Sequence, residues 1–164
     1  MAARAFNVAS ENSTVACATL IFVHPAAAVN PDIEFLRFWV SDATAAATSA
    51  QQRIAIVTQA SSFPTLTGVT PNKLNQGEPN ASVIVSGTSG QAGQAGVTSS
   101  ADNGGTKTTL WPDAFNILNG YLLVPIPEER IIMPASHASG LGLTVPAAPG
   151  TTTGWSYGLT YREV

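Results

Sequence analysis

Prolines and glycines are spread along this whole chain, and they disfavour long helices. The 164 residues include 11 prolines and 14 glycines, and both residue types destabilise the interior of a helix. Few windows keep the apolar spacing of three and four residues that an amphipathic helix requires. The core therefore has to be built from short segments joined by turns, which is how all-β domains are built.

Short runs of β-branched and aromatic residues lie between these turns and predict strands. In the clearest run, Trp155, Tyr157, Leu159 and Tyr161 alternate with small or polar residues. This period of two places the large side chains on one face of a strand. Further runs cover residues 15–23, 33–40, 53–58, 82–86, 108–111, 121–126, 130–133 and 141–145.

These runs predict an all-β fold, an antiparallel β-sandwich of eight or nine short strands with little or no helix. Jelly-roll topology is favoured over an immunoglobulin-like one, because the disulfide of true immunoglobulin domains needs two cysteines and Cys17 is alone. We expect Cys17 to be a buried, unreactive thiol. A single sandwich domain is expected over residues 14–164, preceded by an N-terminal arm at residues 1–13.

Residues 87–107 predict a long flexible loop within this domain. Almost all of them are Gly, Ser, Thr, Ala, Gln or Asn, and Val97 is their only sizeable apolar residue. Loops of this length in compact domains are usually functional or disordered. Two interpretations stay open, a mobile surface loop and an arm that a neighbouring subunit orders.

No Asp, Glu, Lys or Arg occurs between Ile131 and Tyr161. The whole chain is 10% charged, whereas ordinary soluble domains are about 25% charged. Pro134, Pro146 and Pro149 interrupt the stretch, so it does not predict a membrane span. Because uncharged polar surface costs less to desolvate than charged surface, the stretch indicates a face that a neighbouring subunit covers.

Charge and hydropathy argue against two classes of partner. The net charge of −3 is small and spread out, without the basic stripe that nucleic-acid binding requires. No apolar run resembles a signal peptide or a transmembrane helix. We therefore expect a protein that is made in the cytoplasm and binds neither nucleic acid nor membrane.

No catalytic motif is present, whether nucleophile elbow, phosphate-binding loop, dinucleotide fingerprint or zinc-protease motif. His24 and His137 are the only histidines, and each is expected to be hydrogen-bonded to backbone in a loop. Ser136 beside His137 suggests a hydrolase, but adjacent side chains point apart and rarely form a nucleophile–base pair. The sequence predicts no catalytic, cofactor-binding or metal-binding residues.

Two groups of charged residues have alternative interpretations. Asp32 and Glu34 are two residues apart, so they could act as paired carboxylates, hold a calcium ion, or form an ordinary pair at the rim of the domain. Glu128, Glu129 and Arg130 form the densest charge cluster. This cluster predicts a solvated turn before a strand, or an ion pair at the rim.

Aromatic residues could line a platform on which sugar rings stack. The candidates are Trp39, Trp111, Trp155, Tyr157 and Tyr161. The alternative is that they fill the sandwich core or a subunit interface, where aromatic side chains bury large areas. At 7% aromatic, the chain has barely enough of these residues for one core. Core or interface is therefore the favoured interpretation.

Several segments between Ile33 and the end of the chain follow one another in the same order as similar segments in a known protein family. They are strands at 33–38 and 52–57, a Thr/Pro/Gly loop at 65–75, a charged segment at 127–134, a Gly-Leu-x-Leu strand at 140–143 and a terminal aromatic strand ending in Arg162-Glu163. In this arrangement the chain resembles the capsid decoration (cement) proteins of tailed phages, a class of small all-β proteins. Residues 87–107 match no motif of that family.

This resemblance implies a virion structural protein on the exterior of the capsid. Such a protein is expected to be a homotrimer that binds the phage major capsid protein and ties neighbouring subunits together, without catalytic residues or cofactors. The alternative is a carbohydrate- or receptor-binding jelly-roll module of a head fibre or tail tip. An esterase-like hydrolase that uses Ser136 and His137 is the third hypothesis.

Overall fold

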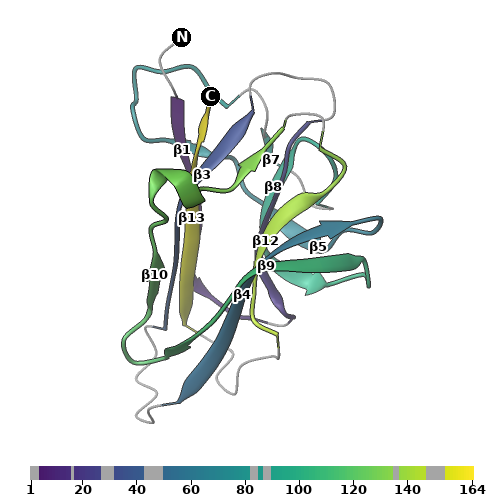
Figure 1. Ribbon diagram of the computed structural model, residues 1–164, viewed down its shortest axis with the longest axis vertical. Coiled ribbons are helices and arrows are strands. Elements are labelled where there is room, and N and C mark those ends of the chain that lie inside the picture. The colour runs from purple at the N-terminus through teal and green to yellow at the C-terminus, as the bar shows by residue number, and fades with distance from the viewer. Residues whose placement is uncertain are drawn as a thin grey trace.

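Two β-sheets pack face to face in the computed structural model of this chain (Figure 1). The structure describes residues 4–15, 17–26, 32–42, 50–81, 85–86, 90–134, 137–146 and 154–164. Sheet A contains β1 (Arg4–Ser13), β3 (Ile33–Asp42), β6 (Asn72–Lys73), β10 (Tyr121–Leu123), β11 (Ile132–Met133) and β13 (Trp155–Glu163). Sheet B contains β2 (Thr19–His24), β4 (Gln51–Ala60), β5 (Thr65–Gly68), β7 (Val85–Ser86), β8 (Gln94–Ala101), β9 (Thr106–Asn116) and β12 (Gly140–Thr144). Within these ranges the one helical segment is a 3₁₀ turn, η1 (Pro127–Glu129).

Eight of these strands form a jelly roll. In sheet A the order is β10-β3-β13-β1, and in sheet B it is β9-β4-β12-β2. Numbered along the chain, these eight strands are therefore ordered 6-3-8-1 and 5-4-7-2, which is the jelly-roll order. All pairings within these two sets are antiparallel. The predicted antiparallel sandwich with jelly-roll topology is confirmed.

The core between the sheets is built from alternate side chains of these strands. In β13, Trp155, Tyr157, Leu159 and Tyr161 are all 0% exposed, which confirms the face that their alternation predicts. The ring of Trp155 packs edge-on against Phe115 of β9, with centroids 6.3 Å apart. Because β13 belongs to sheet A and β9 to sheet B, this aromatic contact connects the two layers.

Residues 4–13 form β1 instead of the N-terminal arm that the sequence predicts. β1 lies between β13 and β6 in sheet A, and its register with β13 begins at Arg4 opposite Glu163. Phe6 and Val8 point into the core and are 0% exposed. This segment has few large apolar residues, so its sequence does not predict a strand. It becomes a strand because it pairs with β13 at the other end of the chain. Residues 1–3 lie outside the described part.

Most of the predicted loop at 87–107 is a strand followed by a turn. Residues 94–101 form β8, which pairs with β2 and with β5. Ala95 and Val97 are buried in the core. β8 consists mainly of small residues, which are buried because β2 and β5 lie on either side. Small residues have a weak strand preference, so the sequence does not predict this strand. Residues 87–89 lie outside the described residues.

The remaining predicted strands are present with shifted ends. The runs at 33–40, 53–58, 108–111, 121–126, 130–133 and 141–145 correspond to β3, β4, β9, β10, β11 and β12. The run at 15–23 becomes β2, which begins only at Thr19, so Cys17 precedes the strand and is partly exposed rather than buried. Of the run at 82–86, the structure describes residues 85–86 as β7. β5 and β6 were not predicted as strands.

Glycines in two central strands make room for aromatic rings on the outer faces of the sheets. On sheet B, a Cβ atom at Gly140 would lie 2.3 Å from the ring of Phe22, which is 0% exposed. On sheet A, a Cβ atom at Gly158 would lie 2.8 Å from the indole ring of Trp39. The uncharged outer face of β13 is therefore already covered in part by a side chain from β3.

Candidate interaction surfaces

The two histidines contact backbone atoms, as expected from the sequence, but His24 is the buried last residue of β2 and does not lie in a loop. His24 is 3% exposed, and its Nδ1 and Nε2 atoms lie 3.1 Å from the carbonyl oxygen of Gly90 and 3.3 Å from that of His137. Burial lowers the pKa of His24, and the two carbonyl contacts oppose this effect. His137 is exposed, and its Nδ1 accepts a hydrogen bond from the backbone N–H of Ser139 at 3.1 Å.

The geometry gives the hydrolase hypothesis no further support. Each ring nitrogen of His24 lies beside a backbone carbonyl oxygen. Among the described residues, no hydroxyl or thiol group is hydrogen-bonded to either histidine. Ser136, the proposed nucleophile, lies outside the described residues.

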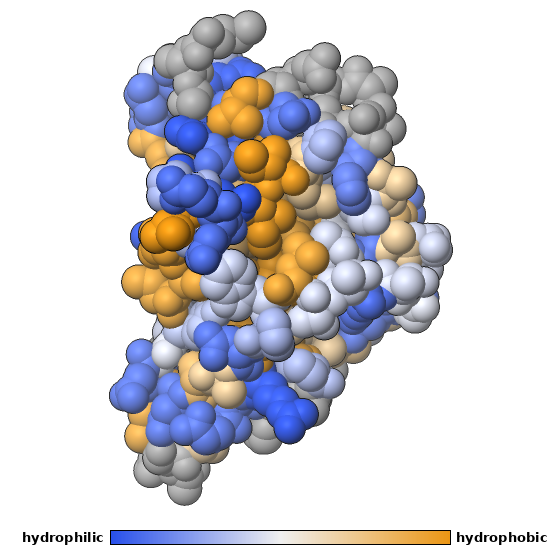
Figure 2. All heavy atoms as spheres, viewed as in Figure 1, coloured by the Kyte–Doolittle hydropathy of each residue, from blue (hydrophilic) through white to orange (hydrophobic). Residues whose placement is uncertain are grey.

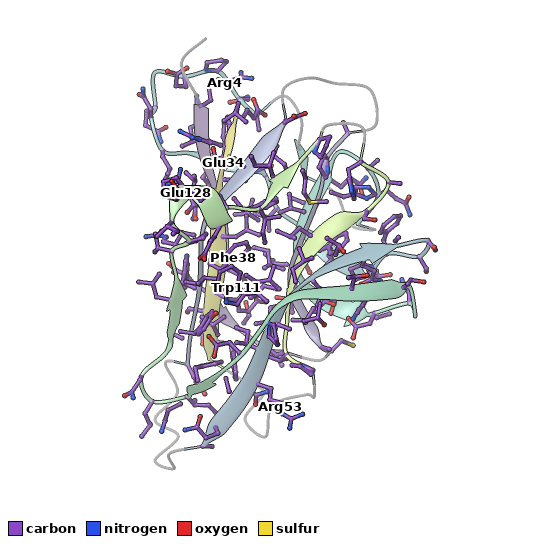
Figure 3. All side chains as sticks on the ribbon, in the orientation of Figure 1. Arg4, Glu34, Phe38, Arg53, Trp111 and Glu128 are labelled. Atoms are coloured by element: carbon purple, nitrogen blue, oxygen red, sulfur yellow. The ribbon has the colours of Figure 1, made fainter. Side chains whose placement is uncertain are left out.

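Glu34 is paired with two arginines rather than used as half of a carboxylate pair. Nη1 of Arg130 donates to Oε1 of Glu34 at 3.1 Å, and Nε of Arg162 donates to Oε2. Burial alone would raise the pKa of Glu34, but the hydrogen bonds and charges of Arg162 and Arg130 hold that pKa below its ordinary value. The cluster fastens η1 and β13 to β3, so Glu34 has a structural role. Figure 3 shows it toward the end of the sandwich where β1 begins.

The acidic residues of the predicted charge cluster are solvated. Glu128 and Glu129 are exposed in η1, whereas Arg130 turns inward to its ion pair. No group of three or more His, Cys, Asp or Glu side chains in the described residues could hold a metal ion.

Four of the five aromatic candidates pack in or against the core. Trp155, Tyr157 and Tyr161 are fully buried, and Trp111 of β9 is partly buried against the same core cluster. Figure 3 shows Trp111 among the side chains between the two sheets. Trp39 alone stands on an outer face, over Gly158. The core interpretation is therefore confirmed for the residues of β13, and the five do not form one platform.

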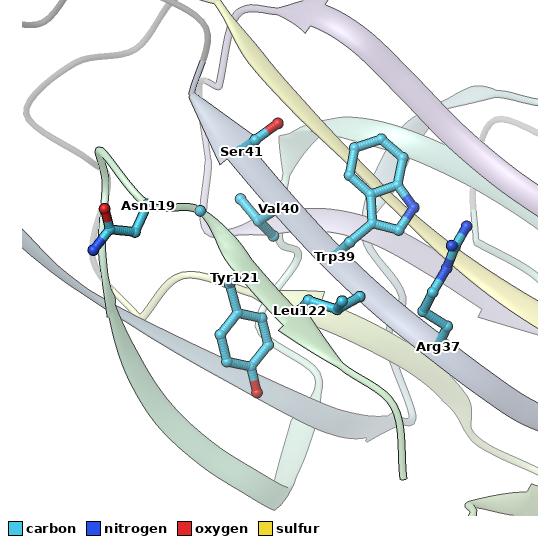
Figure 4. A pocket seen from close by; sticks show the side chains of 8 residues that line it. Arg37, Trp39, Val40, Ser41, Asn119, Tyr121 and Leu122 are labelled. Atoms are coloured by element: carbon cyan, nitrogen blue, oxygen red, sulfur yellow. The ribbon is translucent and has the colours of Figure 1, made fainter.

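A shallow pocket of about 370 Å³ surrounds Trp39 on the outer face of sheet A (Figure 4). Arg37, Trp39 and Ser41 reach it from alternate positions of β3, and Leu122 stands opposite Trp39 in the register of β10. Its other lining residues are Val40, Asn119, Gly120 and Tyr121. The pocket therefore combines an indole ring and a leucine with a guanidinium group, a hydroxyl and an amide.

Tyr121 supports this pocket from the core side of β10. Its ring packs against Phe115 with centroids 5.9 Å apart. Burial, together with the charge and hydrogen bond of Asp113, raises the pKa of Tyr121 to about 12. The phenol therefore stays protonated near neutral pH and donates to the carboxylate of Asp113.

An exposed apolar ridge runs along the outer edge of sheet A. Eight large apolar side chains are exposed in the described residues, and five of them lie between positions 118 and 132. These five, which we call the apolar ridge, are Leu118, Leu122, Val124, Ile126 and Ile132. Leu118 lies in the turn before β10, and β10 and β11 both pair with β3 on the side away from β13. In Figure 2, apolar side chains gather on the left margin of the molecule, where Figure 1 places β10.

The sequence does not predict this ridge as a distinct surface. Residues 121–126 were expected to form an ordinary strand, although both of its faces are apolar in sequence. A strand at the edge of a sandwich buries one face, so a strand that is apolar on both faces leaves one of them in solvent unless a partner covers it. The apolar residues on both faces of the segment 121–126 are therefore the sequence signal that could predict the ridge.

In the part of the chain that the structure describes, no helix is long and apolar enough to cross a membrane. No protein-family model matches the chain, and no curated protein and no solved structure matches it either.

Proposed function

We propose that this chain is a bacteriophage structural protein, a capsid decoration (cement) protein that acts from the exterior of the virion. In this role it associates as a homotrimer, binds the shell of the major capsid protein and stabilises that shell through contacts between subunits. No catalytic step and no cofactor is part of the proposal.

The apolar ridge is the observation that carries this proposal. Large exposed apolar patches on a soluble domain mark surfaces that other proteins cover, and five exposed side chains follow one another along the same edge of sheet A. The sequence resemblance to cement proteins supplies the class of partner. The fold is compatible with this role but does not select it, because jelly rolls serve capsid proteins, lectins and cupins alike.

Binding to empty, expanded heads of the phage that encodes the chain tests the proposal. Purified protein is mixed with these heads and pelleted, and saturable binding at a fixed ratio to the major capsid protein is expected. Bound heads should also resist heat or mild denaturant longer than bare heads. Protein that stays in the supernatant at every ratio would contradict the proposal.

A carbohydrate-binding module is the second candidate, and the pocket around Trp39 favours it. An indole ring beside hydrogen-bonding groups is the usual composition of a sugar subsite, because the ring face stacks on the apolar face of a pyranose. Arg37, Ser41 and Asn119 supply donors around Trp39. In this alternative the chain is the receptor-binding part of a head fibre or tail tip.

Glycan-array binding distinguishes this second candidate from the first. Binding that is lost in Trp39→Ala but kept in Leu74→Ala would support it, because Leu74 is exposed away from the pocket. An array without any bound glycan would count against the module and leave the cement proposal as it stands.

A further inference from the structure

The strand edges beside the apolar ridge are unsuited to extending a sheet. β10 is three residues long and is followed by Pro125 and Pro127. β9, the edge of sheet B, contains Pro112 and has an irregular register beside Leu110. Proline lacks the N–H group that a neighbouring strand needs, and bulges interrupt the ladder of hydrogen bonds. A partner must therefore pack against the side chains of the ridge instead of adding a strand.

Charges of both signs flank the ridge. Arg37 is exposed on the outer face of β3, and Glu128 and Glu129 are exposed in η1, within the segment that carries the ridge. Within the described residues, none of these three side chains forms an ion pair. One molecule therefore presents both halves of an interfacial ion pair. Two copies of such a surface can complement each other, whereas a uniformly acidic or basic partner matches only half of it.

We propose that the apolar ridge is the contact between copies of this chain, with the ridges of neighbouring copies packed around a shared symmetry axis. Leu122, Val124 and Ile126 form the apolar centre of the contact. At its rim, Arg37 of one copy faces the Glu128–Glu129 turn of the next. An apolar centre within a polar rim is the usual composition of interfaces in homo-oligomers. The inference deepens the proposed function, because it assigns self-association to the ridge and leaves the other surfaces for the shell.

Aspartate substitutions test the ridge directly. We expect wild-type protein to sediment with the mass of three chains, and Val124→Asp/Ile126→Asp to sediment as a monomer. Leu74→Asp is the matched control: Leu74 is 58% exposed, against 58% for Val124 and 57% for Ile126, and it follows β6 at the opposite edge of sheet A. This control should keep the wild-type mass. Thermal melting must show that all three proteins are folded, and Leu122→Ser/Val124→Ser replaces the aspartate variant if that variant does not fold.

A charge reversal tests the rim. Arg37→Glu should weaken self-association about tenfold or more, since it places like charges across the interface. Combining it with Glu128→Arg and Glu129→Arg should restore the wild-type dissociation constant. A ridge variant that keeps the wild-type mass overturns the proposal, and so does a wild-type protein that stays monomeric at every concentration tested.

Shell binding, measured on the same samples, separates this inference from the proposed function. If wild-type chains associate through the ridge but do not bind capsid shells, the interface stands and the cement function is wrong. If the wild-type protein is itself monomeric but binds shells, shell binding stands and the interface is wrong.

Discussion

At the scale of single residues, the outer faces of this sandwich depend on the absence of side chains at a few positions. Gly140 and Gly142 of β12 lie beneath Phe22 of the neighbouring strand, and a Cβ atom at either position would be at or within 3.0 Å of its ring. Phe22 is fully buried and also contacts Phe63, with centroids 6.0 Å apart. The packing of Phe22 therefore requires glycine at both positions of the Gly-Leu-Gly-Leu segment.

We predict that Gly140→Ala destabilises the protein by roughly 1–3 kcal/mol, the usual cost of overpacking a filled site. The added methyl group would lie 2.3 Å from the ring of Phe22 and 3.1 Å from Cβ of His24. The free energy of unfolding in urea measures the effect. Gly77→Ala is the control, because its Cβ atom would make only an ordinary contact of 3.5 Å. Equal stability of the two variants would show that the segment around Phe22 can relax.

Glu34 predicts how stability depends on pH. Its pKa in the folded protein lies below the ordinary value of 4.5, because the hydrogen bonds and charges of Arg162 and Arg130 outweigh burial. A carboxyl group whose pKa is lowered by folding stabilises the fold above its unfolded pKa, and this contribution is lost as the pH falls through the folded pKa. The stability of wild type should therefore decline as the pH falls below 4.5.

Glu34→Gln should lower the free energy of unfolding near pH 7 by about 2 kcal/mol, since two charge-assisted hydrogen bonds lose their ionic acceptor. The difference from wild type should shrink as the pH falls below 4.5. Denaturation at a series of pH values measures it. Glu128→Gln, at an exposed position of η1, should stay parallel to wild type throughout. A difference between wild type and Glu34→Gln that does not change with pH would refute the linkage.

At the scale of elements, the sequence predicts those strands that carry their own hydrophobic signal. β3, β4 and β13 have large apolar residues at alternate positions, and the predicted runs lie inside the observed strands. β1 and β8 consist mainly of small and polar residues, and each becomes a strand because it lies between partners in its sheet. The ridge is not predicted for a related reason. Which side chains stay exposed depends on which strand lies at the edge of the sheet. Pairing over long distances in the chain supplies this information, and local sequence does not.

Asp102 is the residue that fixes the end of β8. Its carboxylate accepts the backbone N–H groups of Ala18 and Thr19, both at 3.1 Å, so the β8–β9 turn is fastened to the start of β2. Asp102→Ala should destabilise the protein by roughly 1–3 kcal/mol, because two donors lose their acceptor. Amide hydrogen exchange should accelerate in residues 17–20. Asp102→Asn, which keeps one acceptor oxygen, should lie between the alanine variant and wild type, and an alanine variant with unchanged exchange would contradict this role.

At the scale of the whole molecule, the uncharged stretch from Ile131 to Tyr161 is largely accounted for within one chain. Its large side chains fill the core, and the outer face of β13 is partly covered by Trp39 over Gly158 and by the Asn7–Thr160 contact of 3.3 Å. The large apolar side chains that stay exposed are instead concentrated in the ridge, of which only Ile132 belongs to that stretch. The low charge of the chain thus has two sources, a well-filled core and one apolar edge.

The closure of sheet A depends on the two ends of the chain. β13 lies between β3 and β1, so the centre of the sheet forms only when the first and last strands meet. Val164 extends the pairing of β13 with β3 by donating its N–H to the carbonyl oxygen of Asp32 at 2.9 Å. Such distant pairing makes folding slow compared with that of helical proteins of similar size.

Deletion of residues 1–13 should therefore unfold the protein instead of removing an accessory arm. The deletion removes Phe6 and Val8, which are both fully buried. Truncating a buried phenylalanine costs about 3–5 kcal/mol by itself, while a whole domain is stable by only about 5–15 kcal/mol. The deletion also exposes the edge of β13 that pairs with β1. Circular dichroism should show no cooperative melting for the deleted chain, whereas Phe6→Leu, which keeps β1 and most of its volume, should melt cooperatively below wild type. A deleted chain that melts like wild type would mean that sheet A closes without its N-terminal strand.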